Sequence, residues 1–376
     1  MADKRALHHQ TVRALIDNKH VLATIRSLVG FDGFVDEIVH LVDKRASKDK
    51  YTTIKDLSTL ARRIEEAAGQ STNIEMVVRQ VKIGGNGPIM ANALAALGFP
   101  LTYIGILGHP AIHPVFAELD RRAKIVSLGE PAHTDALEFD DGKIMLGKMA
   151  TLHDITWATL LEKVGHSALV EYFSDSQLIV LVNWTMTPHM SDIWRHLLDE
   201  VCPQLAPAPT KRWLFFDLAD PEKRTTADLK EALSLIGRFE QFYQVVLGLN
   251  EKEGNEIAEV LELPIKDDSP QSLQRFAADT RERLRISAVV IHPREYAVAA
   301  SAGETTFVAG PFTSKPLIST GAGDHFNAGF CLGIIMNLPL ESCLLAGVTA
   351  SGYYVRTGKS PSAVELVHFI ENWPSE

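Results

Sequence analysis

A run of small residues that ends in an aspartate, 319–324 (STGAGD), could do chemistry on a negatively charged substrate. The glycines on either side of Ala322 allow the backbone to approach a ligand closely. Residues 325–337 have helical spacing, and N–H groups at a helix N-terminus attract phosphate oxygens. Asp324 would then lie where a carboxylate can accept a proton from an attacking hydroxyl. The alternative is an ordinary turn in which Asp324 caps the helix.

A second glycine-rich turn, 84–87 (GGNG), precedes a helix of small residues, 89–97, that ends at a glycine. The turn does not fit the pattern G-x-G-x-x-G, so it does not predict a dinucleotide site. A third segment, 250–253 (NEKE), follows the apolar strand candidate 243–249. Asn-x-x-Glu at a helix start forms a capping box, and that is the simplest explanation of this segment taken alone.

Together, and in this order, the three segments resemble the signatures of the ribokinase-like (phosphofructokinase-B type) family of sugar and nucleoside kinases. Residues 318–326 resemble the pattern D-[TS]-x-G-A-G-D-x-F, and 84–98 resemble the N-terminal signature of that family. The resemblance covers about residues 28–370. It implies a carbohydrate kinase with ATP as the donor, Mg²⁺ as the cofactor and a hydroxymethyl group of a small sugar or sugar derivative as the acceptor.

The resemblance also implies a role for each matching residue. Gly321, Ala322 and Gly323 would form an anion hole for the transferred phosphoryl group, and Asp324 would be the general base. We expect an ordinary carboxylate pKa of about 4 to suffice for this base, because the hydroxyl becomes acidic as the new bond forms. The expected substrate residues are Asp36, Gly85 and Asn86, with Asp32 as a weaker candidate because Asp-Gly is also common turn chemistry. Asn250 and Glu253 would bind the nucleotide phosphates and, through water, magnesium.

The chain departs from the family pattern at several positions. Ile318 replaces an aspartate of a monovalent-cation site, so activation by potassium does not follow from the resemblance. Ile89 replaces the usual asparagine, for which Asn86 is a candidate substitute. The nucleotide-contacting T-x-G-x-x-G is replaced by 291–296 (IHPREY), where His292 and Arg294 either contact the nucleotide or are merely solvated. Gly347 stands where the family has an adenine-side asparagine or histidine.

Two other functions of the same fold stay open. The protein could be a non-catalytic sensor that binds a sugar or nucleotide, or a sugar kinase that uses ADP as donor. The acceptor is not identified by the sequence; Asn183 and Trp184 are candidates to line its pocket. His109 and His113 have the spacing of metal ligands, but the neighbouring prolines disfavour a helical zinc pair.

The remaining pattern predicts the fold that must position these residues. Short apolar strands alternate with helices, which is typical of a doubly wound, mostly parallel sheet with helices on both faces. The predicted strands are 28–31, 101–107, 177–183, 212–217, 243–249 and 286–292, and the predicted helices are 53–68, 89–97, 190–201, 225–237, 251–261, 270–283, 325–337 and 340–355. Strands within about 35–43, 74–83 and 136–148 have one polar face and predict a small β-sheet lid. We expect a single ribokinase-like α/β domain over 1–376, with a helical extension at 1–26.

Composition excludes several classes of protein. The chain has 376 residues, of which 46% are hydrophobic and 22% charged, as in ordinary globular enzymes. A formal charge of −10 without a basic stripe disfavours a nucleic-acid partner. The absence of an apolar leader, of a membrane span and of paired cysteines predicts a cytoplasmic protein. Besides sugar and nucleotide, the expected partner is a second copy of the chain, bound through the lid.

Overall fold

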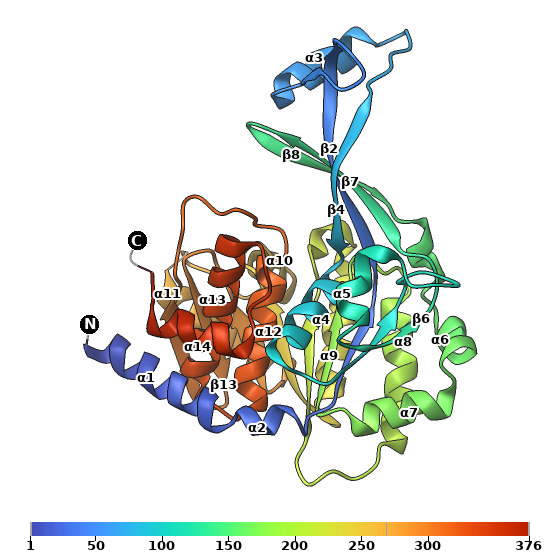
Figure 1. The fold of residues 1–376 in the computed structure, drawn as a ribbon. Coiled ribbons are helices and arrows are strands. Elements are labelled where there is room, and N and C mark those ends of the chain that lie inside the picture. The colour runs from blue at the N-terminus through green and yellow to red at the C-terminus, as the bar shows by residue number, and fades with distance from the viewer. Residues whose placement is uncertain (1, 268, 375–376) are drawn as a thin grey trace.

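The computed structural model describes residues 2–267 and 269–374 and has an α/β fold built on two sheets (Figure 1). The main sheet has nine strands in the order β14-β13-β12-β11-β10-β9-β1-β5-β6. The strands from β12 to β6 run parallel, and β13 is antiparallel to both of its neighbours, β12 and β14. Its strands are β1 (Ser27–Phe31), β5 (Leu101–Gly105), β6 (Lys124–Ser127), β9 (Leu178–Val182), β10 (Arg212–Asp217), β11 (Tyr243–Leu249), β12 (Ala288–Ile291), β13 (Tyr296–Ser301) and β14 (Glu304–Ala309).

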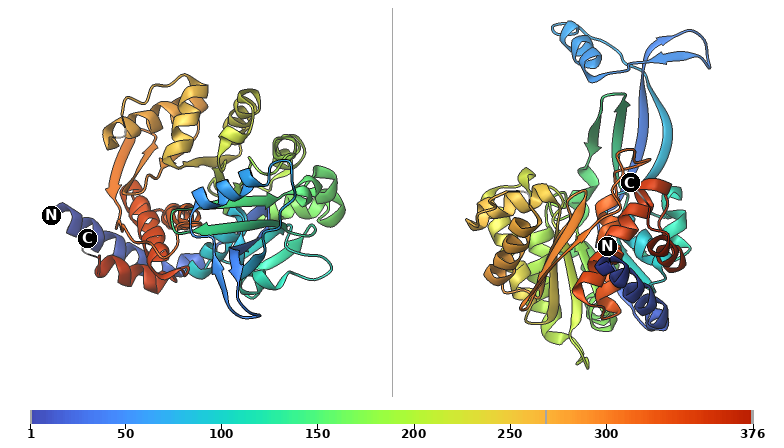
Figure 2. Two further views of the ribbon diagram at one scale, coloured as in Figure 1. Left: turned by 90° about the horizontal axis from the view of Figure 1, so that it is seen from above. Right: turned by 90° about the vertical axis from the view of Figure 1, so that its left-hand side faces the viewer.

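Helices cover both faces of this sheet (Figure 2). One face carries α6 (Trp157–Lys163), α7 (His166–Asp175), α8 (Met190–His196), α9 (Thr226–Phe239), α10 (Glu251–Leu261) and α11 (Pro270–Leu284). The other carries α1 (Ala2–Asp17), α2 (Lys19–Leu22), α4 (Asn86–Leu97), α5 (Ala117–Asp120), α12 (Ala322–Ile335), α13 (Leu340–Thr357) and α14 (Ala363–Glu371). Among the described residues, no helix is both long and apolar enough to cross a bilayer.

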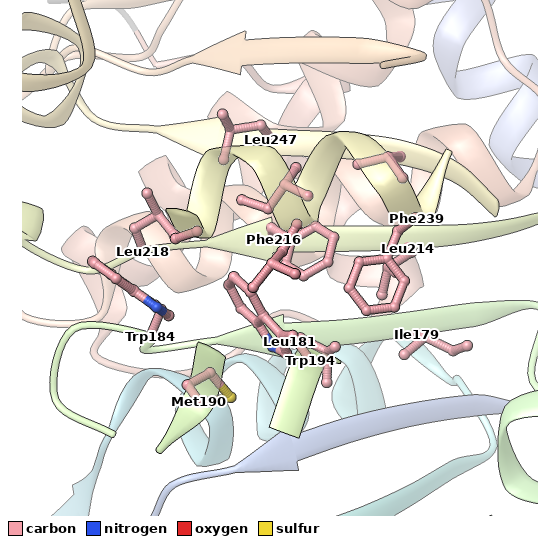
Figure 3. Close-up of a cluster of buried hydrophobic side chains, with 14 of the residues drawn as sticks. Ile179, Leu181, Trp184, Met190, Trp194, Leu214, Phe216, Leu218, Phe239 and Leu247 are labelled. Carbon is pink, nitrogen blue, oxygen red and sulfur yellow. The ribbon is translucent and has the colours of Figure 1, made fainter. Parts of the chain in front are cut away.

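The strands are apolar throughout because both of their faces are buried. Along β9, Ile179 and Leu181 pack into one core, whereas Leu178, Val180 and Val182 pack into the other. This alternation follows from the two-residue period of a strand. Figure 3 shows the first core, where side chains of β9, β10 and β11 meet those of α8 and α9.

The strand order reverses between β1 and β9. From β1 the chain builds outward to β5 and β6, and it then returns to β9 and builds toward β12 on the other side. Ligands of doubly wound sheets bind at such a switch point, outside the carboxyl ends of the strands. Asp32 and Asn183 follow β1 and β9 directly, so the fold places both side chains at this crevice.

The second sheet stands off the main body, with α3 (Leu57–Glu66) at its far end (Figure 1). Its strands are β2 (Phe34–Arg45), β3 (Tyr51–Thr53), β4 (Met76–Gly84), β7 (Ala132–Phe139) and β8 (Gly142–Lys148), and β2 pairs with β3, β4 and β7. A small core of Val39, Leu41, Ile54, Leu60 and Leu137 lies between this sheet and α3.

The structure corrects several expected elements. The helix predicted over 53–68 begins only at Leu57, because Asp56 caps it and 51–53 pair with β2 as a strand. The helix predicted within 1–26 is interrupted at Asn18, whose side-chain amide donates to the carbonyl oxygen of Ala14. The strand β6, the hairpin β13–β14 and the helix α14 were not predicted, since they are short or flanked by weak turn signals.

Candidate active site

The turn before α12 has the geometry of an anion-binding helix start. Gly321 is the N-cap residue and has φ 92°, a conformation that side chains with a Cβ disfavour. Gly323 lies in the first helical turn, where backbone N–H groups have no intrahelical acceptor. The structure therefore places 321–323 where a phosphate oxygen can be bound by backbone groups.

Asp324 lies in the first turn of α12 and is only 5% exposed. Its Oδ1 accepts a hydrogen bond from Nδ2 of Asn86, the first residue of α4, at 3.1 Å. Burial raises the pKa of Asp324 to about 8, and the charges of Asp32 and Glu253 act in the same direction, whereas the Asn86 hydrogen bond opposes them. The ordinary pKa that we expected from the sequence is therefore wrong, because the site removes this carboxyl from water.

Asp32, which directly follows β1, connects neighbouring segments at the switch point through hydrogen bonds. Its side chain is fully buried; Oδ2 accepts from Nδ2 of Asn183 at 2.5 Å and Oδ1 accepts from the backbone N–H of Gly87 at 3.0 Å. Burial raises the pKa of Asp32 to about 6. Because both oxygens are bonded to protein donors, Asp32 holds the ends of β1, β9 and α4 together.

Asp36 is on β2, where the small sheet meets the crevice. It lies opposite Lys82 of β4 on one side and Thr134 of β7 on the other. A Cβ on Gly84 would lie 2.3 Å from Oδ1 of Asp36, so a larger residue at this position would displace the Asp36 carboxylate. Burial raises the pKa of Asp36, and Lys82 partly offsets that effect.

Two further buried carboxyls, those of Asp217 and Glu253, lie near Asp324. Asp217 ends β10 and accepts from Nδ2 of Asn327 at 2.8 Å. Glu253 forms a capping box with Asn250, and it also accepts from the N–H of Asp220 at 3.0 Å. Burial raises the pKa of both carboxyls; the charge of Asp324 raises that of Asp217 further, and the charge of Asp217 raises that of Glu253. The capping box and a phosphate-side role are compatible, since both use the same helix start.

The turn 321–323 is called the anion turn below. A cavity of about 590 Å³ opens beside it. Asn250, His292, Arg294, Gly323 and Phe326 are among its lining residues. It also reaches Val348 and Ser351 on α13, but Gly347 is not part of the lining. A Cβ on Gly347 would lie 2.8 Å from the ring of Phe326, which covers that position. Its neighbours on α13, rather than Gly347 itself, line this cavity.

His292 is the most distinctive side chain of this cavity. Its ring packs on Phe326 with 4.6 Å between centroids, and its buried Nε2 has no hydrogen-bond partner among the described residues. Burial lowers the pKa of His292 to about 4, so the ring is neutral near pH 7. A neutral ring nitrogen without a partner is available to a ligand.

His325 was not singled out in the sequence, although it supports the anion turn. Its Nδ1 donates to the carbonyl oxygen of Gly321 at 2.7 Å, and its Nε2 accepts from Oγ of Ser360 at 2.9 Å. The ring stacks on Tyr354, whose hydroxyl donates to the carbonyl oxygen of Thr320 at 3.0 Å. Burial lowers the pKa of His325 to about 4, which keeps it neutral. Only the tertiary contacts of Ser360 and Tyr354 reveal this support.

The site suits a cation that is held by few protein ligands. In the described part of the chain, no three Asp, Glu, His or Cys side chains converge as a direct metal site. Asp217 and Glu253 nevertheless lie close enough for the charge of Asp217 to raise the pKa of Glu253. In addition, Oδ1 of Asn327 is buried without a hydrogen-bond partner among the described residues. Magnesium retains much of its water shell and binds through one or two carboxylates plus phosphates, so the residues fit that ion.

Comparison with known proteins identifies the family. A family model described as prokaryotic ketohexokinase matches residues 7–373. The chain belongs to this family. A ketohexokinase from Haloferax volcanii is 30% identical over 350 residues, which covers 93% of this chain and 91% of the relative. As a member of the prokaryotic ketohexokinase family, the protein is a carbohydrate kinase.

Solved structures show the same fold for this ketohexokinase-family chain. Ribokinase of Arabidopsis thaliana, complexed with ribose and ATP, matches with a TM-score of 0.61 and 15% identity, over 93% of this chain and 99% of that one. A mutant of phosphofructokinase-2 of Escherichia coli matches with a TM-score of 0.62 and 13% identity, over 93% of this chain and 98% of that one. The ribokinase-like fold predicted from the sequence is confirmed.

Proposed function

We propose that the protein transfers the γ-phosphoryl group of ATP to a hydroxymethyl group of a ketohexose, with Asp324 as the general base. The observation that carries the proposal is the buried contact between Asp324, at the start of α12, and Asn86, at the start of α4. This contact joins the two glycine turns, so an acceptor hydroxyl beside Asp324 would face the N–H groups of 321–323. The relative from H. volcanii, a ketohexokinase by name, supports the acceptor class.

We assign the acceptor to the crevice between the main and the small sheet. Asp36, Gly85 and Asn86 would line it and offer a carboxylate, a backbone group and an amide to sugar hydroxyls. Asp32 acts one step away, because its oxygens already hold Asn183 and Gly87. The small sheet would act as a lid that excludes water during transfer.

We assign the nucleotide to the cavity beside the anion turn, where His292 and Arg294 replace the glycine loop of other members. Asn250 and Glu253 would hold magnesium through its waters, and the ion would neutralise charge on the phosphates. The anion turn 321–323 would stabilise the equatorial oxygens of the phosphoryl group. Asp324 would take the hydroxyl proton while the new O–P bond forms and the bond to the leaving β-phosphate breaks.

The test of this function is an ADP-release assay. The enzyme is given ATP and Mg²⁺ with ketohexoses, aldohexoses, pentoses, sugar phosphates and nucleosides in turn. We expect turnover with a ketohexose in preference to the others. Release of AMP with ADP as the donor would instead support the ADP-dependent alternative. Ligand binding without any turnover would support the sensor.

The raised pKa of Asp324 predicts the pH dependence of the reaction. The base acts only when it is deprotonated, so kcat/KM should rise with pH and level off above about pH 8. The measurement is kcat/KM for the ketohexose across the range from acidic to alkaline pH that the fold tolerates. A rate that falls on going from acidic pH toward pH 8 would contradict the assignment.

Two further features of the protein remain predictions. Cytoplasmic location is supported by three buried cysteines, none of them in a disulfide. Pairing of two chains through the lid is supported by apolar side chains that the small sheet exposes, namely Met76, Val78, Val81, Met145 and Leu146.

A further inference from the structure

Lys143 connects the small sheet to the anion turn. It lies on β8, and its Nζ donates to Oγ1 of Thr320 at 3.3 Å. Thr320 directly precedes Gly321, the N-cap residue of α12. The ammonium group is therefore held at the entrance of the proposed anion hole by a contact between residues 177 positions apart.

Lys82 on β4 lies close enough to Lys143 for the two charges to interact. It is directly opposite Asp36 in the strand register and is partly buried. Burial lowers the pKa of Lys82, and the charge of Lys143 lowers it further. The charges of Asp36 and Glu138 raise this pKa, but by less. The same two lysines are among the charges that act on Asp36. The two ammonium groups thus repel each other, and both lie close enough to Asp36 to lower its pKa.

Neither lysine has a carboxylate in direct contact. Within residues 2–267 and 269–374, no carboxylate lies within ion-pair distance of Nζ of Lys82 or of Lys143. Lys148 on the same strand differs, because its Nζ pairs with Oδ1 of Asp135 at 3.0 Å. In the described part of the chain, the ammonium of Lys143 contacts the neutral hydroxyl of Thr320 instead. Glu138 lies opposite Lys143 and Asp36 lies opposite Lys82 in the strand register, but neither forms an ion pair with its lysine, so both ammonium groups remain able to bind an anion.

The far end of the small sheet holds Lys143 in place. Ile144, its neighbour on β8, packs against the core that contains Leu60 of α3. The hairpin turn is tied to α3 as well, since Oδ1 of Asp141 accepts from the N–H of Leu57 at 3.0 Å. Because side chains alternate along a strand, anchoring Ile144 on one face directs Lys143 to the other. The β3–α3 segment thereby positions the lysine.

We propose that Lys82 and Lys143 form a phosphate-binding pair on the small sheet, which binds the phosphoryl group during its transfer at the anion turn. The inference rests on the proposed function, because it takes 321–323 as the anion hole. Asn86, the residue beside Asp324, carries no charge, so the lysines would supply positive charge on the acceptor side. A lysine ammonium binds phosphate as a compact point charge. As the lid closes, Lys143 would exchange the Thr320 hydroxyl for a phosphate oxygen.

The test compares Lys143→Met and Lys82→Met with Lys148→Met, a matched control on the same strand as Lys143. Kinetics are measured with ATP, Mg²⁺ and a ketohexose. We expect kcat to fall about 10- to 100-fold in Lys143→Met, the effect of one lost charge-assisted hydrogen bond, with unchanged Tm. Lys143→Arg should recover most of the rate, and Lys148→Met should match the wild type. If Lys143→Met aggregates, Lys143→Gln replaces it, because that side chain stays polar.

A second set of measurements distinguishes the source of the phosphate. If the pair binds the group in transfer, Lys143→Met loses rate with a free ketohexose, and inhibition by the ketohexose phosphate product weakens. If it binds a phosphate already present on the acceptor, only turnover of a phosphorylated ketohexose falls, and the proposal is overturned. Identical behaviour of Lys143→Met and Lys148→Met would overturn it as well. Failure of the proposed function itself is recognised separately, by full activity of Asp324→Asn.

Discussion

Replacing Asp324 with asparagine is expected to lower kcat by roughly 10² to 10⁴, the usual contribution of a positioned general base. The change should leave the fold intact. Asparagine has the shape of a protonated carboxyl, and its Oδ1 can still accept from Nδ2 of Asn86. Burial favours the protonated form of Asp324, so the neutral amide replaces a state that the folded protein already prefers below about pH 8.

The measurement is kcat under saturating ketohexose and ATP, together with Tm and binding of each substrate. Asp120→Asn, at an exposed position on α5, is the matched control and should behave as the wild type. Unchanged binding with a lost rate would identify a residue that acts in the chemical step. A variant of Asp324 that keeps both full rate and fold would remove the aspartate from the mechanism.

The second large effect is expected from Asp32→Ala, on stability. The substitution leaves Nδ2 of Asn183 and the N–H of Gly87 as buried donors without an acceptor. Each such donor costs about 1–3 kcal/mol, so the free energy of unfolding should fall by about 2–6 kcal/mol. Activity should fall with it, because Gly87 adjoins Asn86 and the base.

Asp32→Asn separates positioning from direct sugar binding. The new amide can still accept from Gly87, and Asn183 can turn its unpartnered Oδ1 toward the new Nδ2. We therefore expect a smaller loss of stability than in Asp32→Ala. Thermal unfolding and the KM for the ketohexose are measured in parallel. A raised KM with an unchanged Tm in both variants would show instead that Asp32 binds the sugar.

The positions of the site segments were predictable, because each is a local pattern. A glycine before a helix can adopt a positive φ at the N-cap, and Gly85 and Gly321 both do so, at 85° and 92°. The strand–helix alternation likewise predicts a parallel sheet from local periodicity alone. The family resemblance then implied a role for each of these segments, and the comparisons confirm the family.

The errors concern features that depend on distant neighbours. The pKa of Asp324 depends on its burial and on charges at 32 and 253, none of which is visible in the local sequence. Gly347 is covered by Phe326 from another helix. His325, which donates to the carbonyl oxygen of Gly321, is itself held by Ser360 and Tyr354 from distant parts of the chain.

The sequence by itself thus determined the fold class and the family, since these follow from residue types at short spacing, and the same short patterns carry the proposed roles of the site segments. The tertiary structure alone decided which side chains meet. Asp324 and Asn86 are 238 positions apart, and Lys143 and Thr320 are 177 apart. The physical reason is that burial and electrostatic interaction depend on packing across the switch point and the small sheet, which no local pattern encodes.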